Sequence, residues 1–360
     1  MTVTCIPTPV PGQAADEAGS LPFVTVIIPC LNEEKFIEKM LRSVAGNDYP
    51  HDRMEILVMD GGSSDGTPDI VARVGREFPF IRLEPNPDRF KPHALNRGIR
   101  LARGQIVVRM DAHSTYARTY VSRSVALLTE RGVDNVGGLR HTVATPMNLL
   151  GKCLAEVYNN RFGAGNATYR TGAATERLVD TVFGGCYRRK LFERIGYFDE
   201  RLLRGQDREF NARLLRHGGK ILFSPQIECW YYARSSFFGH LRYMFTGGAV
   251  PFVLNRVVGY RVAGLRNLVP LCFLGALVAP LPASVHYPTC LLLSGAFLGL
   301  HLLVGLASTV RASVRSRSLG MALVLPALFL LSHLAYGLGS LWGLVKPIAT
   351  SAHCRSTASG

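Results

Sequence analysis

The sequence predicts an α/β domain built on a mostly parallel sheet, followed by helices that cross a membrane. Two observations lead to this prediction. Short apolar strands alternate with amphipathic helices in the first third of the chain, which is typical of an open parallel sheet. From Leu268 to the end there is no Asp or Glu, although the chain has 26 of them. Such a segment is typical of membrane helices rather than of a soluble core.

The expected elements follow one another in regular order. Strands are expected at Thr25–Ile28, Glu55–Met59, Ile81–Leu83 and Gln105–Met110, with helices beginning at Glu33, near Pro68 and near His93. Asn32 is expected to cap the first of these helices, because its side-chain oxygen can accept a backbone N–H of the first turn. The strands should therefore lie side by side and end at one common edge.

Polar residues follow three of these strands. They form the clusters Pro29–Glu33, Asp60–Asp65 and Asp111–His113. In open α/β sheets ligands bind beyond the carboxyl ends of the strands, so the three clusters are expected to form one site. Each has a structural alternative: a strand-end Asp often caps a turn, and an Asp-x-His pair is more often structural than metal-binding.

The chemistry of these residues fits a nucleotide and a metal ion. Asp60 can accept a hydrogen bond from a base or a ribose hydroxyl, and Lys91 can neutralise a phosphate. Asp111 and His113 offer a carboxylate and an imidazole, which suit Mn²⁺ or Mg²⁺ bridging a diphosphate.

The composition of the chain limits the classes of partner that the protein is expected to bind. The net charge is +15, which fits nucleic acid, anionic membrane lipids or a phosphorylated substrate. No zinc-finger spacing or aromatic–basic motif is present, so membrane lipids and a phosphate-bearing substrate are expected and nucleic acid is not. The eight cysteines form no CxxC pair, which is typical of a reducing compartment.

Three apolar runs form the second part of the chain, at Leu268–Val285, Pro288–Ser308 and Leu319–Val345. Each is near the roughly 20 residues that cross a bilayer. The alternative is a set of buried helices in a soluble core. Arginines precede the first run and separate the second from the third, whereas the joint between the first two has none. The positive-inside rule then places the front domain on the cytoplasmic side of the membrane.

The expected organisation is a disordered leader over 1–22, a catalytic domain over 23–234, an interfacial amphipathic segment over 235–267, about three spans over 268–345 and a tail over 346–360.

Five motifs in order resemble family 2 glycosyltransferases, which have the GT-A fold. They are Val24–Glu34, Met59–Thr67, Lys91–Gly98, Asp111–His113 and Gly205–Glu209. Met110–Ser114 together with Asp180–Gly185 is most similar to the succinoglycan-type glucosyltransferases of bacterial exopolysaccharide assembly.

The resemblance implies a role for each motif residue. Nucleotide binding is implied for Pro29, Asn32, Glu33, Asp60, Lys91, Asn96 and Asp111. Asp111 and His113 would hold a divalent metal, Mn²⁺ or Mg²⁺, while Gly184, Gly185 and Arg242 would lie near the acceptor or the diphosphate. Asp207 would be the catalytic base, with Glu209 as the competing candidate; for Arg242 the alternative is an interfacial arginine.

The implied reaction is inverting transfer of a sugar, glucose as a family-level expectation, from a UDP-linked donor to a polyprenyl-diphosphate-linked saccharide. Gly61 and His113 stand where the family carries aspartates. These departures leave open a catalytically decayed membrane protein that binds sugar nucleotides or acts as a scaffold. A nucleotidyltransferase would need a basic, glycine-rich loop after the first strand, which Pro29–Glu34 lacks.

Overall fold

The computed structural model describes residues 21–234 and 236–346. The expected leader therefore lies outside the described residues except for 21 and 22, and the expected tail except for Lys346. The chain divides into two compact units. The sheet unit comprises Met1–His141 and Gly172–Tyr231, and the helical unit comprises Thr142–Thr171 and Tyr232–Gly360.

A single sheet runs through the sheet unit in the order β3-β2-β1-β4-β8-β6-β9-β5, and β7 pairs with β9. Its strands are β1 Val24–Cys30, β2 Met54–Asp60, β3 Ile81–Pro85, β4 Ile106–Arg109, β5 Ser114–Tyr116, β6 Asn135–Thr145, β7 Arg177–Leu178, β8 Cys186–Arg188 and β9 Ile221–Arg234. Strands β3, β2, β1 and β4 are parallel, as expected. Strand β8 pairs antiparallel with both β4 and β6, and β9 pairs antiparallel with β5 and β7, so an antiparallel half extends the expected sheet.

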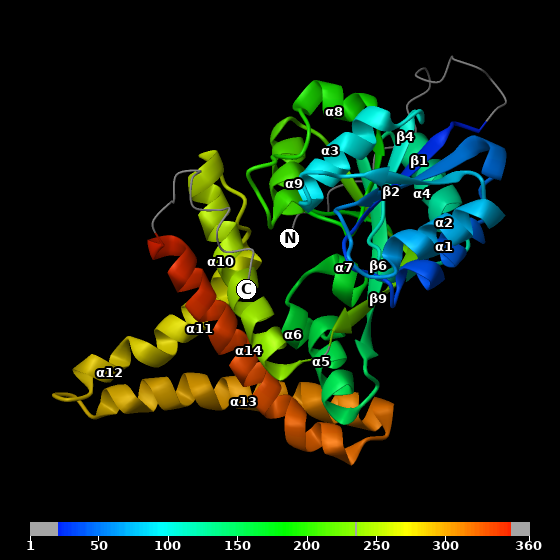
Figure 1. Ribbon diagram of the computed structural model, residues 1–360. Helices are drawn as coiled ribbons and strands as arrows, with labels where there is room; N and C mark the ends of the chain where they lie inside the picture. Colours follow the sequence, from blue (N-terminus) through cyan, green and yellow to red (C-terminus); the bar gives the residue numbers. More distant parts are fainter. Residues whose placement is uncertain (1–20, 235, 347–360) are drawn as a thin grey trace. The chain divides into compact units, whose positions relative to one another are not determined.

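Helices cover both faces of the parallel half because its strands are apolar on both faces. In β1, Val26 and Ile28 belong to one core and Ile27 to the other. Figure 1 shows α1, α2 and α4 on one side of the sheet and α3, α8 and α9 on the other. The bounds are α1 Ile37–Ala45, α2 Thr67–Glu77, α3 Lys91–Leu101, α4 Tyr120–Glu130, α8 Lys190–Ile195 and α9 Gln206–Arg216, with a short 3₁₀ helix at His51–Arg53.

The expected cap of the first helix is wrong. Helix α1 begins at Ile37, and Asn32 lies ahead of it with a left-handed backbone (φ 53°). The Asn32 side-chain oxygen accepts the backbone N–H of Ser64, 2.9 Å away in the loop after β2. Asparagine tolerates this backbone region, and here it ties two loops together instead of starting a helix.

The helical unit contains the apolar second part of the chain and an excursion between β6 and β7. Its helices are α5 Leu149–Asn159, α6 Arg161–Ala164, α7 Thr168–Thr171, α10 Phe237–Val258, α11 Leu265–Val278, α12 Pro280–Ala283, α13 Thr289–Ser316 and α14 Leu319–Val345. Three stretches are long and apolar enough to cross a membrane: Leu265–Ala283, Thr289–Ser316 and Leu319–Val345, with 19, 28 and 27 residues. They coincide closely with the three runs read from the sequence.

The core of the helical unit contains a neutral hydrogen-bonded cluster. His240 of α10 lies between the hydroxyl of Tyr158 and that of Ser332, at 2.8 Å from each. Both His240 and Ser332 are buried, at 2% and 0% exposure. These contacts join α10 to α5 and α14. Burial lowers the pKa of His240 to about 4, so the ring is neutral at pH 7.

Candidate active site

Two loops at the edge of the sheet are cross-linked by hydrogen bonds between their backbones and side chains. The Asn32 N–H donates to the Ser63 hydroxyl at 2.9 Å, and the Glu33 N–H donates to the Thr67 hydroxyl at 2.8 Å. Since Pro29 pairs with Met59 in the β1–β2 ladder, both loops leave the sheet at the same level. The structure thus brings together the first two polar clusters that the sequence predicted.

Asp60 holds the turn that follows β2. Its carboxylate accepts the N–H groups of Gly62 and Ser63, at 3.2 and 3.1 Å, and the Ser63 hydroxyl at 2.6 Å. The turn-capping alternative is therefore present in the structure, and any nucleoside contact by Asp60 is additional to it.

Gly61 stands where the family carries a second aspartate, and a side chain has no room there. A Cβ at Gly61 would lie 2.8 Å from the carbonyl oxygen of Arg89, whose own backbone is left-handed (φ 66°). The loop after β3 is held in this place by the Asn86 N–H, which donates to the Asp60 carbonyl at 2.7 Å. The Arg89 carbonyl therefore occupies the space that a side chain at position 61 would need.

Asp111 lies in a cationic setting. Its side chain is 8% exposed, and Oδ1 contacts the Lys91 ammonium at 2.6 Å and the Arg109 guanidinium at 2.9 Å. Lys91 is the first residue of α3, and Arg109 is the last of β4. Burial alone would raise the pKa of Asp111, but Arg109 and Lys91 hold it well below its ordinary value. Asp111 is therefore ionised throughout the physiological pH range.

Asp207 joins the same cluster through Arg109. It lies in the first turn of α9, and its Oδ2 is 2.9 Å from Nη1 of Arg109. Its Oδ1 is buried and has no hydrogen-bond partner among residues 21–234 and 236–346. The competing candidate, Glu209, is 2% exposed and pairs with Arg213 at 2.8 Å. Of the two acids, Asp207 is the one in the charged cluster.

His113 is held by Glu33. Nδ1 of His113 lies 3.0 Å from Oε1 of Glu33, and Tyr231 packs edge-on against the ring at 4.8 Å. A carboxylate on one ring nitrogen fixes the tautomer with the proton on that nitrogen, which leaves Nε2 as an acceptor or ligand. Oε2 of Glu33 is buried and has no hydrogen-bond partner within the described part of the chain.

Gly184 and Gly185 run against the end of β4. The Arg109 N–H donates to the Gly185 carbonyl at 2.9 Å. Gly184 has φ 72°, and a Cβ there would lie 2.9 Å from the Arg109 carbonyl, so only glycine fits without strain. These residues therefore border the charged cluster.

Two predicted residues are not placed in this cluster. Asn96 is 1% exposed, and its side chain hydrogen-bonds the backbone of Phe198 and the Glu200 carboxylate, so it fixes the loop before α9. That Asn96 also binds the nucleotide stays a prediction. Arg242 belongs to α10 of the helical unit.

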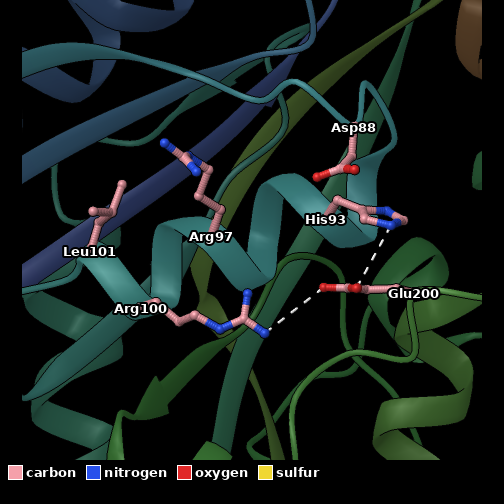
Figure 2. Close-up of a pocket in the computed structure, with 6 residues that line it drawn as sticks. All are labelled: Asp88, His93, Arg97, Arg100, Leu101 and Glu200. Atoms are coloured by element: carbon pink, nitrogen blue, oxygen red, sulfur yellow. Dashed lines mark ion pairs between the residues drawn. The ribbon is translucent and has the colours of Figure 1, made fainter.

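A separate cavity of about 350 Å³ lies beside α3 in the sheet unit. It is lined by Asp88, His93, Arg97, Arg100, Leu101 and Glu200. Figure 2 shows Glu200 facing His93 and Arg100, with ion-pair distances of 3.7 and 4.0 Å.

Arg109 is the site residue that the sequence reasoning missed. It was included in an expected apolar strand, and its side chain is only 4% exposed. The available signal was a charge among the apolar residues of β4, two positions before Asp111. A buried arginine needs anionic partners, so its place in a buried strand already predicted nearby carboxylates.

Comparisons with known proteins relate the chain to glycosyltransferases. The model of the family described as "Glycosyl transferase family 2" matches residues 25–196. The succinoglycan biosynthesis protein ExoA of Rhizobium meliloti is 30% identical over 285 residues, which cover 74% of this chain and 83% of that protein.

A second relative extends over nearly the whole chain. It is the dolichyl N-acetyl-alpha-D-glucosaminyl phosphate 3-beta-D-2,3-diacetamido-2,3-dideoxy-beta-D-glucuronosyltransferase of Methanococcus voltae, 27% identical over 91% of this chain and 99% of that protein. Among solved structures, the mannosyltransferase PcManGT of Pyrobaculum calidifontis matches with a TM-score of 0.54 and 23% identity, over 91% of this chain and 88% of that one. That likeness confirms the GT-A fold class. The protein is a glycosyltransferase that belongs to family 2.

Proposed function

We propose that the protein transfers glucose from UDP-glucose to a polyprenyl-diphosphate-linked saccharide during assembly of a cell-surface or exopolysaccharide. The observation that carries the proposal is the cluster of Lys91, Arg109, Asp111 and Asp207, which places two carboxylates and two cations at one edge of the sheet. Two relatives support a lipid-linked acceptor and a polysaccharide product by their names. One is named as a glycosyltransferase that acts on a dolichyl-phosphate-linked sugar, and the other as a succinoglycan biosynthesis protein.

The donor is proposed to lie along the loops that follow β1, β2 and β4. Pro29, Asn32, Glu33 and Asp60 would border the nucleoside, and Lys91 and Asp111 the diphosphate. Lys91 is 34% exposed, so its ammonium remains accessible to a phosphate while it contacts Asp111. An ammonium close to a diphosphate stabilises the negative charge that develops on the leaving group.

A divalent metal fits the chemistry of the residues present. Within the described ranges no three His, Cys, Asp or Glu side chains gather to hold an ion by themselves, so the diphosphate would have to supply further ligands. Asp111 and His113 would supply the protein ligands, with the His113 ring oriented by Glu33. When bound, Mn²⁺ or Mg²⁺ would neutralise charge on the leaving diphosphate. The structure of the related mannosyltransferase contains GDP-mannose and Mn²⁺.

The reaction is proposed to be a single displacement with inversion. Asp207 takes the proton of an acceptor hydroxyl as the hydroxyl oxygen forms a bond to the anomeric carbon. The bond from that carbon to the nucleotide diphosphate breaks at the same time. Gly184 and Gly185, which border the cluster, are proposed to lie beside the transferred sugar. Arg242 is proposed to contact the acceptor or its diphosphate.

The protein is proposed to sit in the bacterial inner membrane with its catalytic domain, 23–234, in the cytoplasm. The three candidate spans support membrane attachment. Arg311 and Arg315 near the end of Thr289–Ser316, together with Arg317 directly after it, support this orientation. The segment 235–267 would form the interfacial link to the spans at 268–345.

Transfer of a labelled sugar tests the proposal. Detergent-purified protein would be incubated with radiolabelled UDP-glucose, UDP-galactose, UDP-N-acetylglucosamine or GDP-mannose, Mn²⁺ and a lipid extract from the source cells. We expect label from UDP-glucose to enter the organic phase and free UDP to accumulate with it. Tight nucleotide binding without transfer from any donor would instead favour the decayed, sugar-nucleotide-binding alternative.

A further inference from the structure

Arg109 is the one side chain within the described residues that contacts both Asp111 and Asp207. Its Nη2 lies 2.9 Å from Oδ1 of Asp111, and its Nη1 lies 2.9 Å from Oδ2 of Asp207. We propose that Arg109 is a positioning residue that fixes the Asp207 carboxylate for proton transfer and ties it to the donor-binding carboxylate, Asp111. This inference rests on the proposed function, in which Asp207 is the base.

The backbone of Arg109 is held firmly, so its guanidinium starts from a fixed point. Arg109 pairs with Ile27 in the β1–β4 ladder, and its N–H donates to the Gly185 carbonyl. A guanidinium is a rigid planar fork whose two Nη atoms can bind two carboxylates at once. A lysine at the same place carries the same charge but only one nitrogen. The geometry of the bridge therefore depends on arginine specifically.

Burial of Arg109 makes its carboxylate partners necessary. The Arg109 side chain is 4% exposed, and removing an anionic partner of a buried cation leaves an uncompensated charge. Arg109 thereby fixes one oxygen of Asp207, while Oδ1 remains without a hydrogen-bond partner in the described part of the chain. Because buried polar atoms are almost always hydrogen-bonded, Oδ1 is the oxygen to which a bound acceptor hydroxyl would donate its hydrogen bond.

Lys91 provides an internal comparison. It contacts the same oxygen of Asp111 as Arg109 does, at 2.6 Å, and within the described part of the chain no ion pair joins it to Asp207. Loss of Lys91 should therefore disturb the donor side alone. Loss of the Arg109 fork should disturb the donor side and the base together.

The test compares Arg109→Lys, Lys91→Met, Asp207→Asn and the double variant Arg109→Lys/Asp207→Asn in the full-length protein. Nucleotide affinity is measured by titration of UDP, and kcat is measured at saturating donor and acceptor. Arg109→Lys keeps the buried positive charge and is therefore preferred to Arg109→Met, which would leave two carboxylates without a cation. The unfolding midpoint of Arg109→Lys is measured first, to show that the variant is folded before its kinetics are compared.

We expect Arg109→Lys to lower kcat by about 10²-fold, the scale of a misplaced catalytic group. Lys91→Met should weaken UDP binding and also lower kcat, because its ammonium would offset charge on the leaving diphosphate. Since Lys91 does not act through Asp207, its loss should multiply with that of Asp207→Asn in a Lys91→Met/Asp207→Asn protein. Because Arg109 acts through Asp207, adding Arg109→Lys to Asp207→Asn should cause no further loss of kcat.

Three results would overturn the proposal. If Arg109→Lys changes UDP affinity and leaves kcat unchanged, Arg109 is a donor-site cation only. If the losses of the two single variants multiply in the double variant, Arg109 does not act through Asp207. If Asp207→Asn retains full turnover, Asp207 is not the base, and the proposed mechanism fails together with this inference.

Discussion

The two units bury polar side chains in opposite ways. The sheet unit buries charges and pairs them: Arg109 lies between Asp111 and Asp207. The helical unit buries neutral groups and joins them by hydrogen bonds, as His240 does with Tyr158 and Ser332. The exception is Glu156, the only acidic residue in the sequence ranges of the helical unit, which is buried and pairs with Arg315.

The difference follows from what each unit has to do. Ionised groups are costly to bury, so a buried charged cluster needs a functional reason. The cluster of Lys91, Arg109, Asp111 and Asp207 has one if charge develops beside it during the reaction. In a unit that carries membrane spans, neutral hydrogen bonds satisfy buried polar atoms without bringing a charge into an apolar medium. The charged cluster should thus govern turnover, and the neutral cluster should govern stability.

The largest effect is expected for Asp207→Asn. The amide cannot accept the proton from an acceptor hydroxyl, so kcat should fall by about 10²–10⁴-fold. UDP affinity should change little, because Asp111 and Lys91 remain. Steady-state transfer assays and UDP titration measure the two quantities. Glu130→Gln, an exposed acid at the end of α4, serves as the control; an Asp207→Asn variant as active as this control would refute the assignment of the base.

A smaller effect is expected for Glu33→Ala. Loss of a carboxylate that orients a metal-binding histidine typically weakens metal binding by about 10–100-fold. Mn²⁺ affinity can be measured in the presence of UDP from the paramagnetic resonance signal of free Mn²⁺. Glu33→Gln, which keeps an acceptor oxygen for His113, should lose less.

The control for this experiment is Glu38→Gln on α1, since Glu38 pairs with Arg42 and Arg73 at the surface. Unchanged Mn²⁺ affinity in Glu33→Ala would mean that the Glu33–His113 contact does not serve a metal.

In the helical unit, His240→Ala should lower the free energy of unfolding by about 1–3 kcal/mol and leave the affinity for UDP unchanged. The physical reason is that the buried hydroxyls of Tyr158 and Ser332 would lose their partner. Chemical denaturation in detergent, followed by the circular dichroism of the helices, measures the change in the free energy of unfolding. A loss of UDP binding in this variant would contradict the proposal that the neutral cluster governs stability and the charged cluster governs turnover.

The smallest effect concerns pH. His240 has a pKa of about 4 when folded, against about 6.5 when unfolded, so the unfolded chain binds more protons between these values. The stability from the neutral ring is therefore complete above about pH 6.5 and declines as pH falls toward 4. Hydrogen exchange of α10, corrected for intrinsic rates, should be faster at pH 5.0 than at pH 7.5. His240→Gln cannot titrate and should remove this pH dependence; an equal acceleration in His240→Gln would exclude His240 as its source.

The parallel half of the sheet and the candidate spans were accessible from sequence because both depend on local patterns. Apolar runs such as those of β1 and α14 indicate by their composition and length alone that the segment is a buried strand or a candidate membrane span. Lys91 and Asp111 were also found, because residues at the ends of parallel strands and at the following helix meet at one edge.

What the sequence reasoning missed depends on partners far along the chain. Asn32 was expected to serve the next helix, and instead bonds Ser64. Gly61 indicated a lost acid, and only the structure reveals the Arg89 carbonyl that excludes a side chain there. The excursion with α5 has ordinary helical spacing, and its place in the helical unit depends on contacts with α14.

Ligand-dependent thermal unfolding of the detergent-purified protein tests the central claim most directly. The unfolding midpoint would be measured with UDP, GDP, ADP or CDP, with and without Mn²⁺, for the wild type and Asp111→Asn. A ligand that binds the folded state raises the midpoint. The proposed donor site predicts an increase with UDP that requires Mn²⁺ and is absent in Asp111→Asn. No increase with any nucleotide at millimolar concentration would contradict it.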